Sequence, residues 1–323
     1  MYSLLSQKVI PILVPYNTGL KSVNFYLVKN EKSLSLIDAG FNDDTCWGAL
    51  NKALSQNSLA LTDITEIILT HHHIDHVGLV NRIVDVHPIP IYASPLSIPR
   101  LKRDENFLQL RMEYFTRLYR EMGCGETGDK QILYLKKSIE KNKDSAIQGE
   151  IVEITDEYFL DYTVIDVPGH APDQLAFWDE ANNLMFAGDL LIEHISSNAL
   201  VEPDDNGQRI PSLIQHVTSL KKCHSLHVDT LFSGHGSIIH NPNEIIELRL
   251  KRTEEKLDKI HQLIQSGVKT GSELAQTMYR GKYEKEFSLV MSEVIGHLDY
   301  LEHEKRVEKE LVGGVWQYYA KRG

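Results

Sequence analysis

Seven side chains of metal-ligating type fall at or just after predicted strand ends. They are His71, His73, Asp75, His76, His170, Asp189 and His235. Imidazole and carboxylate groups together suit a borderline divalent ion, most often zinc, with iron or manganese as alternatives. A lone histidine at a strand end is usually an ordinary polar residue, but seven such side chains favour a metal site. A metal centre of this kind can activate water for hydrolysis.

The densest part of this set is the segment 70–76, which contains four of the seven residues. The apolar run at 64–69 predicts a buried strand that leads into it, and a helix is predicted to follow. Side chains alternate along an extended segment, so His72 should point away from its two neighbours and is not predicted to be a ligand. The three later residues stand in glycine-flanked turns, where a tight bend lets other atoms approach the backbone closely.

Short strands must position these residues, and helices connect them. The predicted strands span 9–16, 23–29, 33–38, 64–69, 89–93, 149–154, 162–167, 174–178, 184–187 and 230–232. The predicted helices span 43–56, 81–86, 95–145 (a pair), 210–223, 243–266, 273–278 and 287–303, and a hairpin follows at 306–319. We therefore expect one catalytic unit at 1–240, with a helical insertion at 95–145. A long helix and a helix–helix–hairpin module should form 241–323.

Composition favours a globular protein that lacks a broad nucleic-acid surface. The 323 residues carry a formal charge of −11, which disfavours electrostatic binding to nucleic acid along a wide face. The three cysteines are far apart and form no CxxC pair, so we expect reduced thiols. Neither a signal peptide nor a run of about 20 apolar residues is recognisable. We expect a cytoplasmic protein with no membrane partner, and homo-oligomers remain open.

The motif His-x-His-x-Asp-His at 71–76, with the three later residues in the same order, resembles the metallo-β-lactamase superfamily over roughly 8–240. This resemblance implies an α+β fold, a four-layer αββα sandwich with metals at one edge between two sheets. It also implies two divalent ions, most often zinc. The first would be held by His71, His73 and His170, the second by Asp75, His76 and His235, with Asp189 bridging.

The resemblance also bears on the branch of the superfamily. The histidine at position 73 fits the glyoxalase II, lactonase and nuclease branches, whereas the flavodiiron branch has a glutamate there. The apolar spacing around 287–303 resembles a winged-helix extension of some members. A winged helix suggests nucleic-acid binding by analogy, but that helix carries few basic residues, so we favour a structural or pocket-completing role.

Further residues take expected roles from the same resemblance. Asp38 matches a position that supports a metal ligand, and His194 lies where related enzymes have pocket residues. Insertions such as 95–145 shape the substrate entrance in this superfamily. Tyr114, Arg117 and Tyr119 are therefore candidate lining residues, although helical packing explains them equally well.

The expected activity is hydrolysis of a small ester, thioester or lactone. Two ions about 3.5–4 Å apart would make a bridging hydroxide available and polarise the substrate oxygen, and Asp75 would orient the nucleophile and accept a proton. The alternative is a metal-dependent endoribonuclease or other phosphodiesterase of the same fold. A metal-binding regulator without turnover and a mononuclear iron dioxygenase also stay open.

Overall fold

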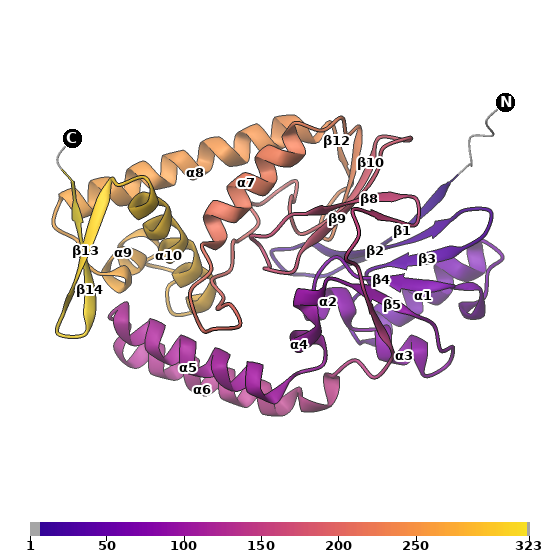
Figure 1. Cartoon of the computed structure of the whole chain (residues 1–323), viewed down its shortest axis with the longest axis horizontal. Coiled ribbons are helices and arrows are strands. Elements are labelled where there is room, and N and C mark those ends of the chain that lie inside the picture. The colour runs from indigo at the N-terminus through magenta and orange to yellow at the C-terminus, as the bar shows by residue number, and fades with distance from the viewer. Residues whose placement is uncertain (1–6, 322–323) are drawn as a thin grey trace.

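The computed structural model describes residues 7–321 and contains two six-stranded sheets that pack face to face (Figure 1). The first sheet has the order β1 (Lys8–Pro15), β2 (Ser22–Lys29), β3 (Leu34–Ile37), β4 (Glu66–Ile68), β5 (Ile91–Ala93) and β6 (Ile151–Glu153). The second has the order β12 (Ile239–His240), β11 (Thr230–Ser233), β10 (Leu184–Gly188), β9 (Leu175–Asp179), β8 (Tyr162–Asp166) and β7 (Tyr158–Phe159). Strands β3 to β6 are parallel, as are β10 and β11, so the turns that follow them gather at the same edge of each sheet.

Strand β2 shows why the two sheets stack. Its side chains alternate between the two faces of the first sheet, and both faces are apolar. Phe25 and Leu27 pack into the outer cluster, whereas Tyr26 and Val28 join Phe186 of the second sheet between the sheets. A strand that is buried on both faces requires a covering layer on each side.

Helices supply those outer layers. The first sheet is covered by α1 (Asp44–Gln56) and α3 (Val80–Val84), and the second by α7 (Ser212–His224) and the first half of α8 (Pro242–Gln265). The predicted four-layer αββα sandwich is therefore confirmed. A single turn, α2 (Ile74–Val77), follows β4, and 3-10 turns lie at Leu61–Asp63, Pro95–Ser97 and Lys143–Ser145.

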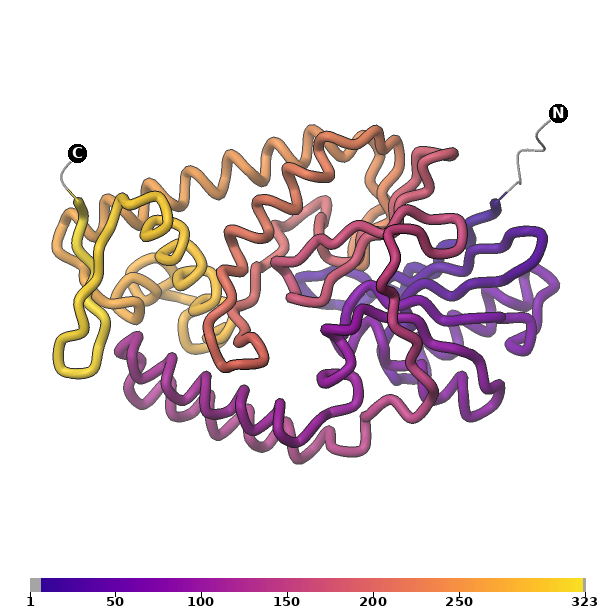
Figure 2. The backbone as a smooth tube through the Cα atoms, in the orientation of Figure 1, coloured from indigo at the N-terminus to yellow at the C-terminus, as the bar shows by residue number. Residues whose placement is uncertain are grey.

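The helical insertion and the C-terminal module share a second core, which lies beside the sandwich (Figure 2). The insertion comprises α4 (Ile98–Leu101), α5 (Glu105–Glu121) and α6 (Gly125–Lys141), and the module comprises α9 (Gly271–Met278), α10 (Phe287–His303), β13 (Val307–Val312) and β14 (Val315–Ala320). Phe115 of α5, Leu298 of α10 and Tyr318 of β14 belong to this one cluster. Helix α8 joins both bodies, because Ile246 packs in the sandwich and Leu257 in the second core.

Local signals in the sequence explain several boundaries. Thr270 caps α9, and its hydroxyl and the Glu273 carboxylate form a reciprocal capping box, so the helix begins at Gly271, two residues before the predicted start. The two-residue strands β7 and β12 were not predicted. The three cysteines are buried and free, as expected. Within residues 7–321, no helix has both the length and the apolar character that crossing a membrane requires.

Candidate metal centre

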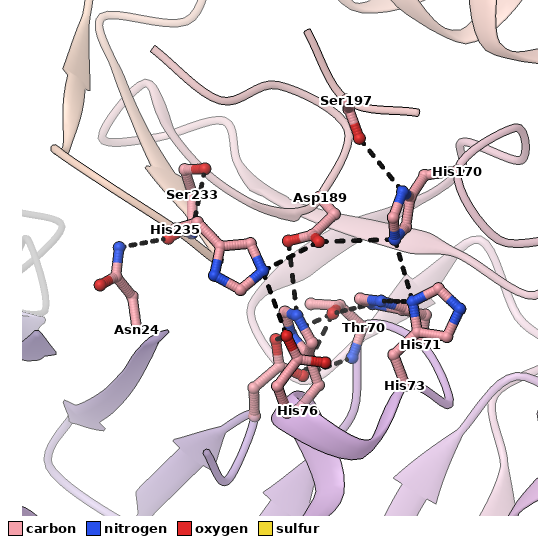
Figure 3. A network of polar contacts seen from close by, with 12 residues as sticks. Asn24, Thr70, His71, His73, His76, His170, Asp189, Ser197, Ser233 and His235 are labelled. Carbon is pink, nitrogen blue, oxygen red and sulfur yellow. Dashed lines mark hydrogen bonds and ion pairs between the residues drawn. The ribbon is translucent and has the colours of Figure 1, made fainter. Parts of the chain in front are cut away.

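The seven predicted residues converge at one edge of the sandwich, although they come from four separate segments of the chain; Figure 3 labels all of them except Asp75. His71 and His73 follow β4, and Asp75 and His76 lie on α2. His170, Asp189 and His235 follow β8, β10 and β11. The structure thus brings together every residue that the sequence analysis proposed as a ligand.

Three imidazoles form the first part of the site. His73 Nδ1 lies 3.0 Å from His71 Nε2 and 2.9 Å from His170 Nε2. Burial, together with the neighbouring imidazoles His76 and His73, holds the pKa of His71 well below its usual value. Burial likewise lowers the pKa of His73 and His170. These rings are therefore neutral near pH 7, the state in which imidazole binds a metal.

The second part contains two histidines among carboxylates. His235 Nε2 lies 3.0 Å from Asp189 Oδ2 and 3.3 Å from Asp75 Oδ2. Burial disfavours the charged ring, but the carboxylates outweigh burial and raise the pKa of His235 to about 10. Burial also opposes protonation of His76, yet Asp38 and Asp189 raise the pKa of that ring well above its usual value. Without a metal, both of these imidazole rings are therefore protonated and positively charged near pH 7.

Asp189 lies between the two parts. Its Oδ1 is 3.4 Å from His76 Nε2, and its Oδ2 is 3.4 Å from His170 Nε2. Three sets of ligand atoms lie within 4.8 Å of one another: His71, His73 and His170; His71, His76 and Asp189; and Asp75, His76 and His235. One carboxylate thus contacts members of both outer sets.

The chemistry of these atoms fits a divalent metal. Apart from the ion-pair contacts above, His76 Nε2, Asp189 Oδ1 and His235 Nε2 are buried and make no hydrogen bond of regular geometry among the described residues. Buried polar atoms are normally paired, because an unpaired one costs free energy. Nitrogen and carboxylate donors that converge without partners are what a borderline cation requires.

Outer contacts fix the orientation of the rings. The Asp38 carboxylate, 2% exposed, accepts hydrogen bonds from His76 Nδ1 at 2.7 Å and from the Thr70 hydroxyl at 2.8 Å. His170 Nδ1 donates to the Asn198 carbonyl at 2.9 Å, and His235 Nδ1 donates to the Ser22 carbonyl at 2.8 Å. In each ring the Nδ1 hydrogen bond leaves Nε2 directed at the centre, the usual arrangement for metal-binding histidines.

Two glycines make room for these groups. A Cβ atom on Gly234 would lie 2.3 Å from Asp189 Oδ1 and 2.5 Å from His76 Cε1. Gly188, with a φ of +49°, would place a Cβ atom 2.6 Å from the Thr70 hydroxyl. A larger residue at either position would clash with these side chains, so both turns need glycine, as the glycine-flanked turns of the sequence predicted.

Two other histidines near the site have different contacts. His72 Nδ1 lies 2.6 Å from Asp173 Oδ1, away from the three converging imidazoles. Asp173 is buried and was not singled out in the sequence, because its partner lies 101 positions away. His194 Nε2 donates to the Gly19 carbonyl at 2.9 Å and does not line the cavity described below.

A cavity of about 560 Å³ opens onto five of the seven residues. Part of its wall is formed by the turn at 19–20 and the loop at 192–200. The C-terminal part of the chain forms the rest, with Lys256 on α8, Tyr279 and Lys282 between α9 and α10, and Leu289 and Glu293 on α10. None of the described lining residues comes from 95–145.

The insertion therefore does not line this cavity, and packing, the alternative given for Tyr114 and Tyr119, is the interpretation that the structure supports. Tyr114 and Tyr119 are buried in the second core, and Arg117 donates to the Gly207 carbonyl at an exposed position. The apolar stripe of α5 is covered by the C-terminal helices, so these aromatic residues pack against that module and not against a substrate.

Known proteins with similar sequences place the chain in a family. A model of the Metallo-beta-lactamase superfamily matches residues 18–235. The probable metallo-hydrolase YqjP of Bacillus subtilis is 30% identical over 304 residues, which is 94% of each chain. A beta-lactamase-like protein 2 homolog of Caenorhabditis elegans is 26% identical over 268 residues, 79% of this chain and 72% of that protein.

Solved structures agree at the level of the fold. A metallo-beta-lactamase family protein of Thermus thermophilus superposes with a TM-score of 0.80 at 24% identity, covering 97% of this chain and 98% of its own. A beta-lactamase domain protein of Burkholderia ambifaria gives a TM-score of 0.78 at 16% identity, covering 97% and 92%. From the family match, the relatives and the converging histidine and aspartate residues, the chain belongs to the metallo-β-lactamase superfamily and is a metal-dependent hydrolase.

Proposed function

We propose that the protein is a binuclear hydrolase of a small ester, thioester or lactone, in the glyoxalase II-like part of the superfamily. His71, His73 and His170 would hold one divalent ion, most often zinc. Asp75, His76 and His235 would hold the other, and Asp189 would be shared. The convergence of all seven side chains beside one cavity carries this proposal.

When bound, two such ions make water nucleophilic near neutral pH and polarise a substrate oxygen. Asp75 is the carboxylate that a substrate can reach, because its side chain is 15% exposed and that of Asp189 is 5% exposed. Asp75 also lines the cavity. Its carboxylate would therefore orient the attacking water and take up a proton.

The cavity wall favours a neutral acyl substrate over a phosphodiester. Lys256 is paired with Glu293, and Lys282 lies 3.4 Å from Glu286. Each lysine of the wall thus has a carboxylate partner, whereas an RNA strand requires free cations for the phosphates that lie beyond the metal ions. Apolar side chains, among them Leu289, make up much of the remaining wall. Cleavage of RNA is the second candidate, and the charge pairing disfavours it.

A substrate screen tests the reaction. Protein loaded with zinc, manganese or iron would be offered nitrophenyl esters, thioesters, lactones, a phosphodiester and single-stranded RNA. We expect ester, thioester or lactone turnover that chelation abolishes and that Asp75→Asn reduces by about 100-fold or more. His227→Gln, a change at a highly exposed histidine, is the matched control. Turnover that survives chelation, or cleavage of RNA alone, would contradict the proposal.

We also propose that the C-terminal module completes the substrate cavity. Leu289 lines the cavity and is 44% exposed, and Leu311 on β13 is equally exposed but lies outside it. Leu289→Asp should raise KM for an apolar ester by about tenfold, because an apolar contact becomes a charge. Leu311→Asp should leave KM unchanged. Equal effects of the two variants on KM would argue against this role.

A further inference from the structure

A buried arginine stands out because it has no counter-ion. Arg249 on α8 is 5% exposed, and arginine is almost never so buried unless it is paired. One terminal nitrogen donates to the carbonyls of Ile192 at 2.9 Å and Glu193 at 2.6 Å. Its Nε has no hydrogen-bond partner, and no carboxylate of residues 7–321 lies within 4.0 Å of the guanidinium. A buried charge without a partner is costly, so a missing anion is the simplest explanation.

Arg249 lines a small chamber next to the cavity described above, and two further cations lie on the same wall. Arg252 and Lys256 follow at spacings of three and seven residues, on the same face of α8. Glu293 is the single carboxylate among the described lining residues, and it is paired with Lys256. The two arginines therefore remain uncompensated. Burial and the charge of Arg252 both lower the pKa of Arg249, as expected for neighbouring cations without an anion between them.

Two buried histidines complete the chamber. His216 of α7 is 6% exposed and His297 of α10 is 2% exposed. His297 Nδ1 donates to the carbonyl of Glu293 at 2.6 Å, so the proton of the neutral ring is on Nδ1. His297 Nε2 then carries a lone pair, and it has no partner. Burial lowers the pKa of His297, which keeps the ring neutral. His216 Nδ1 is also without a partner.

We propose that this chamber binds a small protonated oxyanion, of the bicarbonate or hydrogenphosphate type. The oxygens of such an ion accept from the guanidinium groups of Arg249 and Arg252, as arginine favours. Its O–H group donates to His297 Nε2. The chamber measures about 30 Å³ and opens to solvent beside the exposed Arg252, which favours a small inorganic ion over a larger organic anion. No residue of this site is a candidate metal ligand.

Calorimetric titration of the zinc-loaded, full-length protein with inorganic phosphate and with bicarbonate tests the site. We expect one anion site that persists after the metal is removed, since it is separate from the metal centre. Sulfate, which has no proton to donate near neutral pH, should bind at least about tenfold more weakly than the better of the two protonated ions. Comparison of phosphate with bicarbonate identifies which ion the chamber prefers.

Three variants test whether the anion binds in this chamber or is attracted by surface charge elsewhere. Arg252→Gln alters an exposed residue at the wall of the chamber, and the affinity should fall by about tenfold because one charge-assisted hydrogen bond is lost. His297→Leu should abolish the preference over sulfate. Lys251→Gln, on the same helix but outside the chamber, is the control and should bind as the parent does. Binding that disappears with the metal, that Arg252→Gln does not weaken, or that is equal for sulfate would overturn the proposal.

Discussion

Replacing Asp38 by asparagine tests whether a residue outside the proposed ligand set controls the metal centre. Asp38 has a φ of +58°, a left-handed conformation that asparagine also tolerates. The change therefore removes the charge and leaves the backbone and the side-chain shape in place. The carboxylate normally accepts a hydrogen bond from His76 Nδ1 and thereby directs His76 Nε2 toward Asp189.

The size of the effect follows from these contacts. An asparagine oxygen can still accept from the Thr70 hydroxyl, but the hydrogen bond to His76 loses its charge assistance. A hydrogen bond to a charged group contributes about 1.5–3 kcal/mol, and loss of such a partner of a metal-binding histidine costs about 10–100-fold in metal affinity. We therefore expect zinc affinity to fall by about 10–100-fold, mainly at the site that contains His76.

Competition with a chromophoric chelator measures this affinity, and the metal content of the purified protein gives a second reading. Asp179→Asn is the matched control, because Asp179 is also buried and hydrogen-bonded but caps a turn at Asn182 away from the centre. If Asp38→Asn retained zinc affinity within about twofold of the parent, the orienting role of Asp38 would be refuted.

Three further predictions concern protons, space and charge. Metal uptake should release protons at pH 8, because the raised pKa values of His76 and His235 mean that both rings are protonated without metal and must become neutral to bind it. Calorimetry in buffers of different ionisation enthalpy measures the number of protons released. The release from His235 should fall as the pH rises past about 10. Gly234→Ala should lose bound metal, because its Cβ atom would meet two proposed ligands, whereas Gly48→Ala has open space in α1 and should raise the free energy of unfolding by about 0.5–1 kcal/mol. Arg111→Met should lower the free energy of unfolding by about 2 kcal/mol or more, since it leaves a buried carboxylate without its cation; chemical denaturation measures this, and no loss of stability would contradict it.

The sandwich and the cluster of candidate ligands were predictable because their signals are local. The segment 70–76 carries its ligand types side by side, and the other three residues stand beside glycines at the ends of apolar runs. Buried strands such as β2 are recognisable from their nearly continuous run of apolar residues. Each of these features can be recognised within about ten residues of sequence.

The parts that escaped prediction depend on partners far away in the chain. Strand β7 has two residues and exists only because it pairs with β8. Tyr119 lies on an apolar stripe, but the sequence does not say that α10 covers that stripe. Asp173 and Arg249 are ordinary charged residues until the fold buries one beside His72 and the other without a counter-ion. An apolar pattern in the sequence predicts that one face of a helix or strand will be buried, but it does not identify the element that packs against that face.

Helix α8 begins against the sandwich and ends in the second core, and every candidate ligand precedes it. The candidate ligands therefore lie before α8, whereas the cavity wall combines residues from both sides of it, among them Ile195 and Leu289. Exchange of the stretch that follows would change part of the cavity wall without changing any candidate metal ligand. The junction for such a chimaera is the middle of α8, between Leu250 and Leu257, where packing passes from one body to the other. Such a hybrid would also need the insertion at 95–145 from the parent of its C-terminal part, because Phe115 and Tyr119 of α5 pack in the second core.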